Sequence, residues 1–336
     1  MINRLIALAG TAASQRGRWR HLSARAGEGR MSSWQSRLLA QATSRTIRPL
    51  IARAPITPLT LRGARWAIDR AVAGTGRLPA GTTWRRIELP ACGAEFVCPA
   101  EPAAVTVLYF HGGGFIAGSA RAWRPFVAGL RMPVLSVDYR LAPEHRISDA
   151  IGDGLSAYRW LIEHTSTPVV FAGDSAGGGL AISVALRARD EGLPVPDGLA
   201  VISPWAELGP ARPGPADALL STACVDRVVR LCGTGPEPSA ARADLRGLPP
   251  TLVVAGERDL LAADSHLVAR RLRDAGVRCE LRVWPGQGHA FPLARALPES
   301  AAALAAITSF LTTRSRSPCP TPPSSTPSAT RSRPSP

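Results

Sequence analysis

One sharp turn limits the possible folds of this chain more than any other segment. Residues 168–172 form a short apolar run typical of a buried strand, and the residues that directly follow it are Gly173, Asp174, Ser175, Ala176 and Gly177. Glycine stands near the serine on both sides, as a tight strand-to-helix turn requires when its backbone has no room for Cβ atoms. The pattern predicts that Ser175 is exposed at the apex of this turn as a nucleophile.

A second glycine-rich segment follows another apolar run, at 104–110, and consists of His111, Gly112, Gly113, Gly114 and Phe115. Successive glycines leave backbone N–H groups free to converge on a developing oxyanion. A phosphate-binding loop is excluded because the run lacks the Gly-Lys-Ser/Thr ending. We expect the N–H groups of Gly113, Gly114 and Ala176 to form an oxyanion hole. His111 and Gly112 are expected to shape the loop, and the Asp174 side chain to point away from the substrate.

A candidate acid and a candidate base follow two later strand-like runs. Residues 251–255 lead into Asp259, and residues 280–284 lead into His289. Serine, acid and histidine therefore occur in the chain order of an α/β-hydrolase, each after a predicted strand. Active sites of open α/β sheets lie at that edge. We expect His289 to act as general base and Asp259 to orient it, with Glu257 and Asp264 as alternatives for the acid.

Strand-like and helix-like segments alternate along most of the chain. Strands are predicted at 84–89, 93–98, 104–110, 133–138, 168–172, 199–203, 251–255 and 280–284, and helices near 121–130, 148–164, 176–191, 264–276 and 299–312. This alternation predicts an α/β fold with a mostly parallel eight-stranded sheet, early antiparallel strands and helices on both faces.

These motifs, together with the run Asp138-Tyr139-Arg140-Leu141-Ala142-Pro143-Glu144-His145, resemble the bacterial hormone-sensitive-lipase-like family of α/β-hydrolases. The resemblance covers roughly residues 84 to 312. The chain departs from the family after His145, where Arg146-Ile147-Ser148 replaces the usual Phe-Pro pair, and residues 205–247 are short for the family.

The resemblance implies a serine carboxylester hydrolase that acts on small acyl esters through an acyl-enzyme, without metal or organic cofactor. It also implies that helices at the N-terminus cover the active site as a cap. Two alternatives stay open. One is deacetylation of an O- or N-acetylated metabolite, and the other is a catalytically dead hydrolase fold that acts as a small-molecule receptor.

Three regions are expected along the chain. Residues 1–83 form a basic N-terminal extension and helical cap, 84–314 the catalytic domain with a cap or loop insert at about 205–247, and 315–336 a disordered Pro/Ser-rich tail. Within 34–75, apolar positions recur at helical spacing, and we expect the prolines to divide this stretch into short helices at Pro49, Pro55 and Pro58.

The net charge of +15 lies mainly on the ends of the chain. All forty basic residues are arginines, of which 16 lie within residues 1–86 beside only two acids, and four lie within 312–336 beside none. The remaining body carries 20 arginines and 23 acids, so it is nearly neutral. We therefore expect no specific nucleic-acid partner. A weak membrane-surface contact through the arginine-rich N-terminus and a homodimer remain open.

Cysteine spacing and hydropathy favour a cytoplasmic protein. The six cysteines form no Cys-x-x-Cys pair, which is typical of scattered reduced thiols. No apolar run approaches the ~20 residues that a membrane-spanning helix needs. Residues 1–15 have the features of a short signal peptide, so export is an alternative. We also hypothesise that Met31 is the true initiator.

Overall fold

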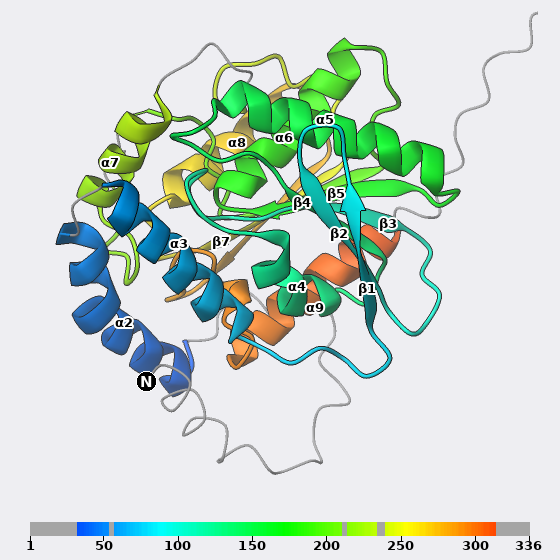
Figure 1. Ribbon diagram of the computed structural model, residues 1–336. Coiled ribbons are helices and arrows are strands. Elements are labelled where there is room, and N and C mark those ends of the chain that lie inside the picture. The colour runs from blue at the N-terminus through cyan, green and yellow to red at the C-terminus, as the bar shows by residue number, and fades with distance from the viewer. Residues whose placement is uncertain (1–31, 54–56, 210–213, 234–238, 314–336) are drawn as a thin grey trace, which may run out of the picture.

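Eight strands form one sheet in the order β1-β2-β4-β3-β5-β6-β7-β8. The structure is a computed structural model, and it describes residues 32–53, 57–209, 214–233 and 239–313 (Figure 1). The strands are β1 Thr83–Glu88, β2 Gly93–Cys98, β3 Thr106–Phe110, β4 Val134–Asp138, β5 Val169–Asp174, β6 Gly198–Ile202, β7 Thr251–Gly256 and β8 Cys279–Trp284. Strand β2 pairs antiparallel with β1 and β4, and all other pairs are parallel. This confirms the predicted fold class.

The central strands are apolar because both faces of the sheet are covered. Every residue of β3, β5, β6 and β7 is buried, whereas the edge strand β1 buries only Ile87. Parallel strands that lie between two helical layers show such continuous apolar runs instead of the alternation of a half-exposed sheet.

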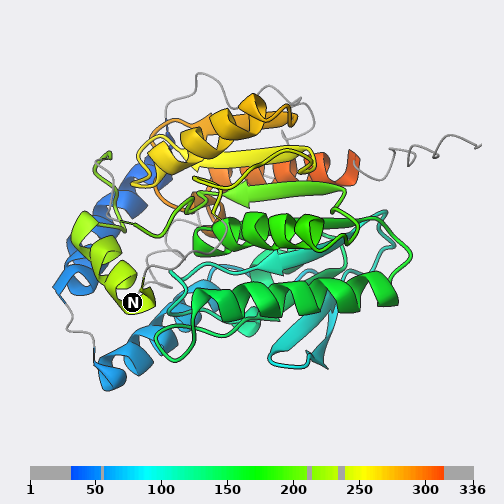
Figure 2. The ribbon, with the colours of Figure 1, turned by 90° about the horizontal axis from the view of Figure 1, so that it is seen from above.

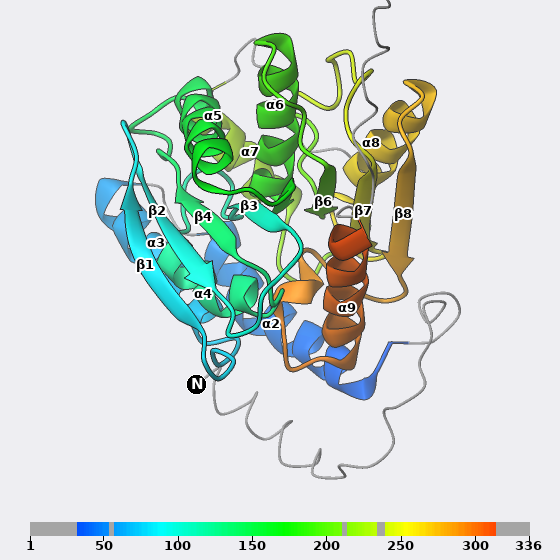
Figure 3. The ribbon, with the colours of Figure 1, turned by 90° about the vertical axis from the view of Figure 1, so that its right-hand side faces the viewer.

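Helices pack on both faces of the sheet. Figure 3 shows α5, α6 and α8 on one face and α4 and α9 on the other. Their bounds are α4 Ala120–Ala128, α5 Ile147–His164, α6 Ala176–Asp190, α8 Ala262–Asp274 and α9 Pro298–Thr312, with a short 3-10 turn, η1, at Phe291–Leu293. Buried apolar side chains fill two clusters, one on each side of the sheet, and Phe110 and Phe126 are among the largest fully buried members.

Three further helices lie together at the end of the sheet toward which the parallel strands point (Figure 2). They are α2 Trp34–Arg53, α3 Pro58–Ala73 and α7 Thr222–Cys232. The prediction that Pro49 divides the first of them is wrong, because Pro49 lies inside α2. Pro58 is instead the first residue of α3, where a missing N–H costs nothing, and Thr57 caps that helix.

The insert at 205–247 is not only a loop, because it contains α7. Its N-cap is Ser221, whose side chain accepts a hydrogen bond from the backbone of Cys224. Its apolar residues Val225, Val228, Val229 and Cys232 have the i, i+3, i+4, i+7 spacing of a helix, but the helix is only 11 residues long and stands between proline-rich segments.

Several expectations fall outside the described residues. They concern the signal-like segment at 1–15, the initiator at Met31 and the tail at 315–336. Within the part of the chain that the structure describes, no helix is long and apolar enough to cross a bilayer. The five cysteines placed there, including Cys92 and Cys98, are free thiols.

Candidate active site

Ser175 lies between β5 and α6 in a backbone conformation that most side chains avoid. Its φ is 56° and its ψ is −121°, and a non-glycine residue at positive φ is strained. Neighbouring segments hold it there, because its N–H donates to the carbonyl of Ile202 at 2.8 Å and its carbonyl accepts from Trp205 at 3.0 Å. The end of β6 and the residues that follow it therefore hold the serine turn in place.

The two glycines of the serine turn are required by close backbone contacts. A Cβ at Gly173 would lie 2.4 Å from the carbonyl oxygen of Gly177, and one at Gly177 would lie 2.1 Å from that of Phe110. Real Cβ atoms do not approach oxygen so closely, so any larger residue would push α6 away from β3 and β5.

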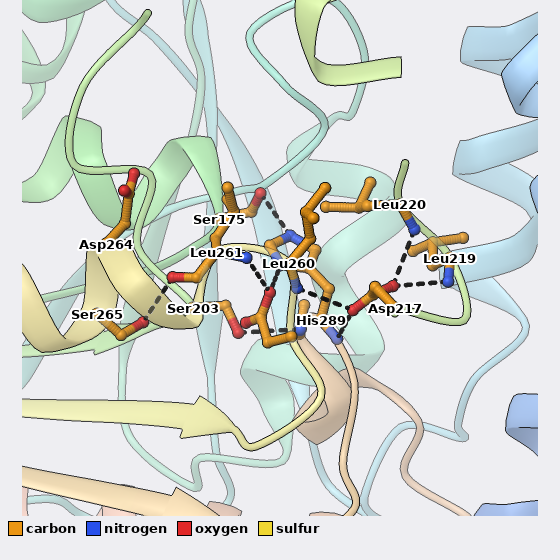
Figure 4. A network of polar contacts seen from close by, with 12 residues as sticks. Ser175, Ser203, Asp217, Leu219, Leu220, Leu260, Leu261, Asp264, Ser265 and His289 are labelled. Atoms are coloured by element: carbon orange, nitrogen blue, oxygen red, sulfur yellow. Dashed lines mark hydrogen bonds and ion pairs between the residues drawn. The ribbon is translucent and has the colours of Figure 1, made fainter. Parts of the chain in front are cut away.

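A continuous chain of hydrogen bonds joins Ser175 to His289 and His289 to Asp259, and Figure 4 shows the contact between Ser175 and His289. The Nε2 atom of His289 lies 2.8 Å from the Oγ atom of Ser175, and its Nδ1 atom lies 2.9 Å from Oδ1 of Asp259. Oδ1 of Asp259 also accepts the backbone N–H of Leu261 at 2.8 Å. Because a carboxylate can only accept, Nδ1 carries a proton and Nε2 is left to accept the serine proton.

The surrounding carboxylates raise the pKa of His289 above its ordinary value. Burial alone lowers the pKa of this histidine, but the negative charge and hydrogen bond of Asp259, with the charges of Asp217 and Asp174, raise it overall. Burial alone raises the pKa of Asp259, but the His289 charge and several hydrogen bonds lower it overall. Asp259 thus stays ionised next to an imidazole that can accept a proton.

The other two acids that the sequence left open have different partners. The carboxylate of Glu257 accepts the backbone N–H of Gly286 at 2.8 Å, and that of Asp264 accepts the backbone N–H of Ala206 at 3.0 Å. Of the three candidate acids, Asp259 is the one that is hydrogen-bonded to His289.

The triple-glycine loop has a backbone that only glycine adopts readily. Gly113 and Gly114 have φ values of 114° and 66°, and a Cβ at Gly113 would lie 2.1 Å from the carbonyl oxygen of Ala117. Among the described residues, no hydrogen bond uses the N–H of Gly113, Gly114 or Ala176. These three donors remain available to a ligand.

The Asp174 carboxylate contacts and stabilises this loop. Its Oδ1 atom accepts from the Tyr109 hydroxyl at 2.7 Å, the Trp123 indole at 2.8 Å and the Gly112 N–H at 3.0 Å. Burial raises the pKa of Asp174 to about 6, against the opposing effect of these donors. A Cβ at Gly112 would lie 2.2 Å from the other carboxylate oxygen, which explains that glycine.

His111 is a buried, neutral part of the same loop. Its Nδ1 atom lies 2.8 Å from the carbonyl oxygen of Gly112, and its ring stacks on Tyr139 at a centroid distance of 4.3 Å. Burial lowers the pKa of His111 to about 4. The Tyr139 hydroxyl also donates to the backbone carbonyl of His111 at 2.7 Å. His111 therefore shapes the loop and carries no charge near neutral pH.

Known proteins share this architecture. The alpha/beta hydrolase fold family matches residues 107–293. The acetyl-hydrolase of Streptomyces hygroscopicus is 35% identical over 270 residues, 74% of this chain and 89% of that protein. The carboxylesterase/phospholipase LipF of Mycobacterium tuberculosis is 36% identical over 306 residues, 82% of this chain and 80% of that protein. A crystal structure of an esterase from the bacterial hormone-sensitive lipase family has a TM-score of 0.74 at 30% identity, over 82% of this chain and 97% of that one.

The chain belongs to the bacterial hormone-sensitive-lipase-like family of α/β-hydrolases. This hydrolase is a carboxylesterase-type enzyme, as its similarity to proteins named esterase, carboxylesterase and acetyl-hydrolase shows. Within its described residues, no group of three or more His, Cys, Asp or Glu side chains could hold a metal ion.

The insert of this hydrolase brings two features to the site that the sequence did not reveal. Helix α7 packs against the glycine loop, where a Cβ at Gly114 would lie 3.2 Å from Val228 and the Cys232 thiol lies 3.6 Å from the Gly114 carbonyl oxygen. In the loop before α7, the carboxylate of Asp217 accepts the backbone N–H of His289 at 2.8 Å. The only sequence signal for Asp217 is that it opens a turn before a capped helix.

Arg65 joins α3 to the hydrolase body. From α3 it donates to the carbonyl oxygens of Ile116 at 2.7 Å and Ala142 at 2.9 Å, and it forms a two-pronged contact with the carboxylate of Glu144 at 2.7 and 2.9 Å. This contact lowers the pKa of Glu144 to about 2. Helix α3 is thereby tied to the residues just after the glycine loop and to the turn after β4.

Proposed function

We propose that Ser175, His289 and Asp259 hydrolyse short- to medium-chain acyl esters through an acyl-enzyme. The observation that carries this proposal is the unbroken hydrogen-bond chain from the Ser175 hydroxyl through His289 to the buried carboxylate of Asp259. A neutral serine is a weak nucleophile unless a base within hydrogen-bond reach removes its proton.

The geometry supports a definite role for each group. Nε2 of His289 accepts the serine proton as Oγ attacks the ester carbonyl, and Asp259 stabilises the imidazolium that forms. The N–H groups of Gly113, Gly114 and Ala176 bind the negative oxygen of the tetrahedral intermediate. Nε2 then returns the proton to the leaving alcohol. Water attacks the acyl-enzyme by the same route and releases the acid.

A p-nitrophenyl ester series from acetate to decanoate tests this proposal. We expect turnover to be highest for short and medium chains, and a brief reaction with the acetate ester to add one acetyl group to the peptide that contains Ser175. Rates indistinguishable from the uncatalysed reaction across the series would overturn the proposal and favour a receptor without catalysis. Preference for an acetylated metabolite over every simple ester would favour the deacetylase, the activity that the name of the Streptomyces relative suggests.

We further propose that the cap contacts an anionic lipid surface. Helix α2 exposes a stripe made of Trp34, Arg37, Leu38, Gln41 and Arg45, and α3 exposes one made of Leu59, Arg62, Gly63, Trp66 and Arg70. Both follow the i, i+3, i+4, i+7, i+11 spacing of one helix face. Four of their large apolar side chains are between 51% and 80% exposed. We call these the arginine–tryptophan stripes.

The stripes face away from the catalytic body. On the other side of α2, Ser36 donates to Gln287 at 2.9 Å, and on the other side of α3, Leu61 is buried at 6% exposure. Neither stripe contains an acid, and the two ends of the chain outside the structure are themselves rich in arginine. Charge repulsion therefore disfavours those chain ends, or a second copy of this chain, as the partner that covers the stripes. Arginine beside tryptophan suits anionic headgroups above an apolar layer.

Vesicle co-sedimentation tests the lipid contact. We expect binding to phosphatidylglycerol-containing vesicles but weak binding to pure phosphatidylcholine. Reversing Arg37, Arg45, Arg62 and Arg70 to glutamate should weaken binding at least ~10-fold, since each arginine near such a surface contributes about 1 kcal/mol. The control reverses Arg270 and Arg278, which are exposed on α8 and before β8, and it should bind normally.

Three outcomes contradict the lipid contact. They are equal binding to both vesicle types, an equal loss in the control variant, and stronger binding to duplex DNA than to the anionic vesicles. Turnover of soluble p-nitrophenyl acetate should be unaffected by the reversals, because none of the four arginines belongs to the hydrogen-bond chain of Ser175, His289 and Asp259. We also propose that the protein is cytoplasmic, in keeping with its free thiols. A homodimer stays a prediction.

A further inference from the structure

Asp217 is a buried carboxylate that the catalytic roles assigned above do not use. It lies in the insert before α7, is 2% exposed and accepts four backbone N–H groups. Two come from its own loop, because Oδ1 accepts from Leu219 at 2.7 Å and from Leu220 at 2.8 Å. These two bonds fix the position of the carboxylate relative to its own loop.

The second oxygen of Asp217 joins the two loops that carry the acid and the base (Figure 4). Oδ2 accepts the N–H of His289 at 2.8 Å and that of Leu260 at 3.3 Å. Leu260 directly follows Asp259, so one oxygen atom holds the backbones on both sides of the contact between His289 and Asp259. The same two loops are also joined directly, by hydrogen bonds from the N–H of Arg258 to the carbonyl of Gln287 at 2.8 Å and from the N–H of Gly286 to Glu257 at 2.8 Å. Asp217 adds a contact at His289 itself and at the neighbour of Asp259, where a shift of ~1 Å can cost a hundredfold in rate.

The charge of Asp217 acts on the same imidazole. His289 is faced by Asp259 from the loop after β7, by Asp174 at the end of β5 and by Asp217 from the insert, while the uncharged Ser175 and Ser203 face the site from the ends of β5 and β6. All three carboxylates favour the protonated imidazole over the neutral one. Of the three, Asp217 is the one whose carboxylate accepts the backbone N–H of His289.

We propose that Asp217 is a positioning residue that holds His289 and Asp259 in register and stabilises the imidazolium formed during acyl transfer. This inference rests on the proposed role of His289 as general base. It assigns a catalytic purpose to the insert, which also packs against the glycine loop through α7. Asp217 touches neither the substrate nor the reacting atoms, so its effect passes entirely through His289.

The variant Asp217→Asn separates this role from a merely structural one. Asparagine keeps one oxygen for the loop N–H groups, but its NH₂ group cannot accept from His289. We expect kcat to fall about 10- to 100-fold with KM nearly unchanged. We also expect the acidic limb of kcat/KM to move to lower pH, because His289 loses a charge that raised its pKa.

The matched control is Asp264→Asn. Asp264 is also buried, at 5% exposure, and accepts the backbone N–H of Ala206 from the start of the same insert. Its removal should lower the melting temperature but leave the acidic limb in place. Histidine-selective NMR titration gives a second readout that does not depend on turnover, and it should show a lower pKa for His289 in Asp217→Asn only.

An acidic limb and a His289 titration at the wild-type positions in Asp217→Asn would overturn the inference. The inference would also be overturned if the two variants lost equal stability and kcat fell no further in Asp217→Asn than in Asp264→Asn. Ser175→Ala is assayed in parallel. If that variant keeps full activity, the proposed function itself fails, which is a different outcome from an unshifted pH profile in an enzyme that depends on Ser175.

Discussion

Ser175→Ala is expected to lower kcat for p-nitrophenyl acetate by about 10³- to 10⁶-fold, the range in which loss of a serine nucleophile falls. The reason is that alanine leaves His289 with no hydroxyl to deprotonate, so the acyl-enzyme cannot form. The backbone N–H groups of Gly113, Gly114 and Ala176 remain, and they account for the residual rate. Steady-state kinetics and the absence of acetylated peptide check the result.

Ser183→Ala is the matched control for that substitution. Ser183 is another buried serine of α6, at 8% exposure, and its hydroxyl donates to the carbonyl of Gly179 at 3.1 Å. Its loss removes a buried hydroxyl from the same helix without touching the hydrogen-bond chain of the site. Equal rates for Ser175→Ala and the wild-type enzyme would rule out Ser175 as the nucleophile.

Asp259→Asn is expected to lower kcat by about 10³- to 10⁴-fold, as for the aspartate of other serine triads. The amide can present NH₂ to Nδ1, which stabilises the tautomer whose Nε2 carries the proton and cannot accept another. The remaining activity should show an acidic limb at lower pH, because Asp259 contributes most to raising the pKa of His289.

Asp264→Asn and Glu257→Gln serve as controls, since both acids were alternatives for the same role. Their carboxylates accept from Ala206 and Gly286 respectively, so neither variant should reproduce the loss. A loss of similar size in Asp264→Asn, at unchanged stability, would transfer the role to that residue. Circular dichroism melts of all variants provide the comparison of stability.

Much of the sheet could be predicted because its signals are local. The buried strands β3, β5, β6 and β7 are short apolar runs followed by glycine or polar turns, and helical segments separate most of them. The serine turn was equally readable, since the steric demand at Gly173 and Gly177 arises within a few residues of Ser175 and from the neighbouring strand.

Predictions failed where distant contacts override local preference. Pro49 lies inside α2, although an interior proline costs a helix about 3 kcal/mol. The helix is held at both ends by the rest of the protein: Ser33 donates to Glu299 at 3.0 Å, and the Arg227 guanidinium donates to the carbonyl of Ile51. Helix α7 was missed because it spans only 11 residues between proline-rich segments, and its Val228 packs on Gly114, which is far away in the chain.

Local sequence alone specifies the strand–turn–helix unit around Ser175, the glycine loop at 112–114 and the chain order of serine, acid and histidine. Each depends on backbone sterics or on strand ends, which short segments encode. Tertiary packing places Asp259 on His289, while Asp264 and Glu257 bind other backbone groups. The same packing ties Arg65 of α3 to the body and sets Asp217 against His289. The Asp217–His289 contact joins residues 72 positions apart, and the direction of a carboxylate across such a gap is set by packing, which no local pattern records.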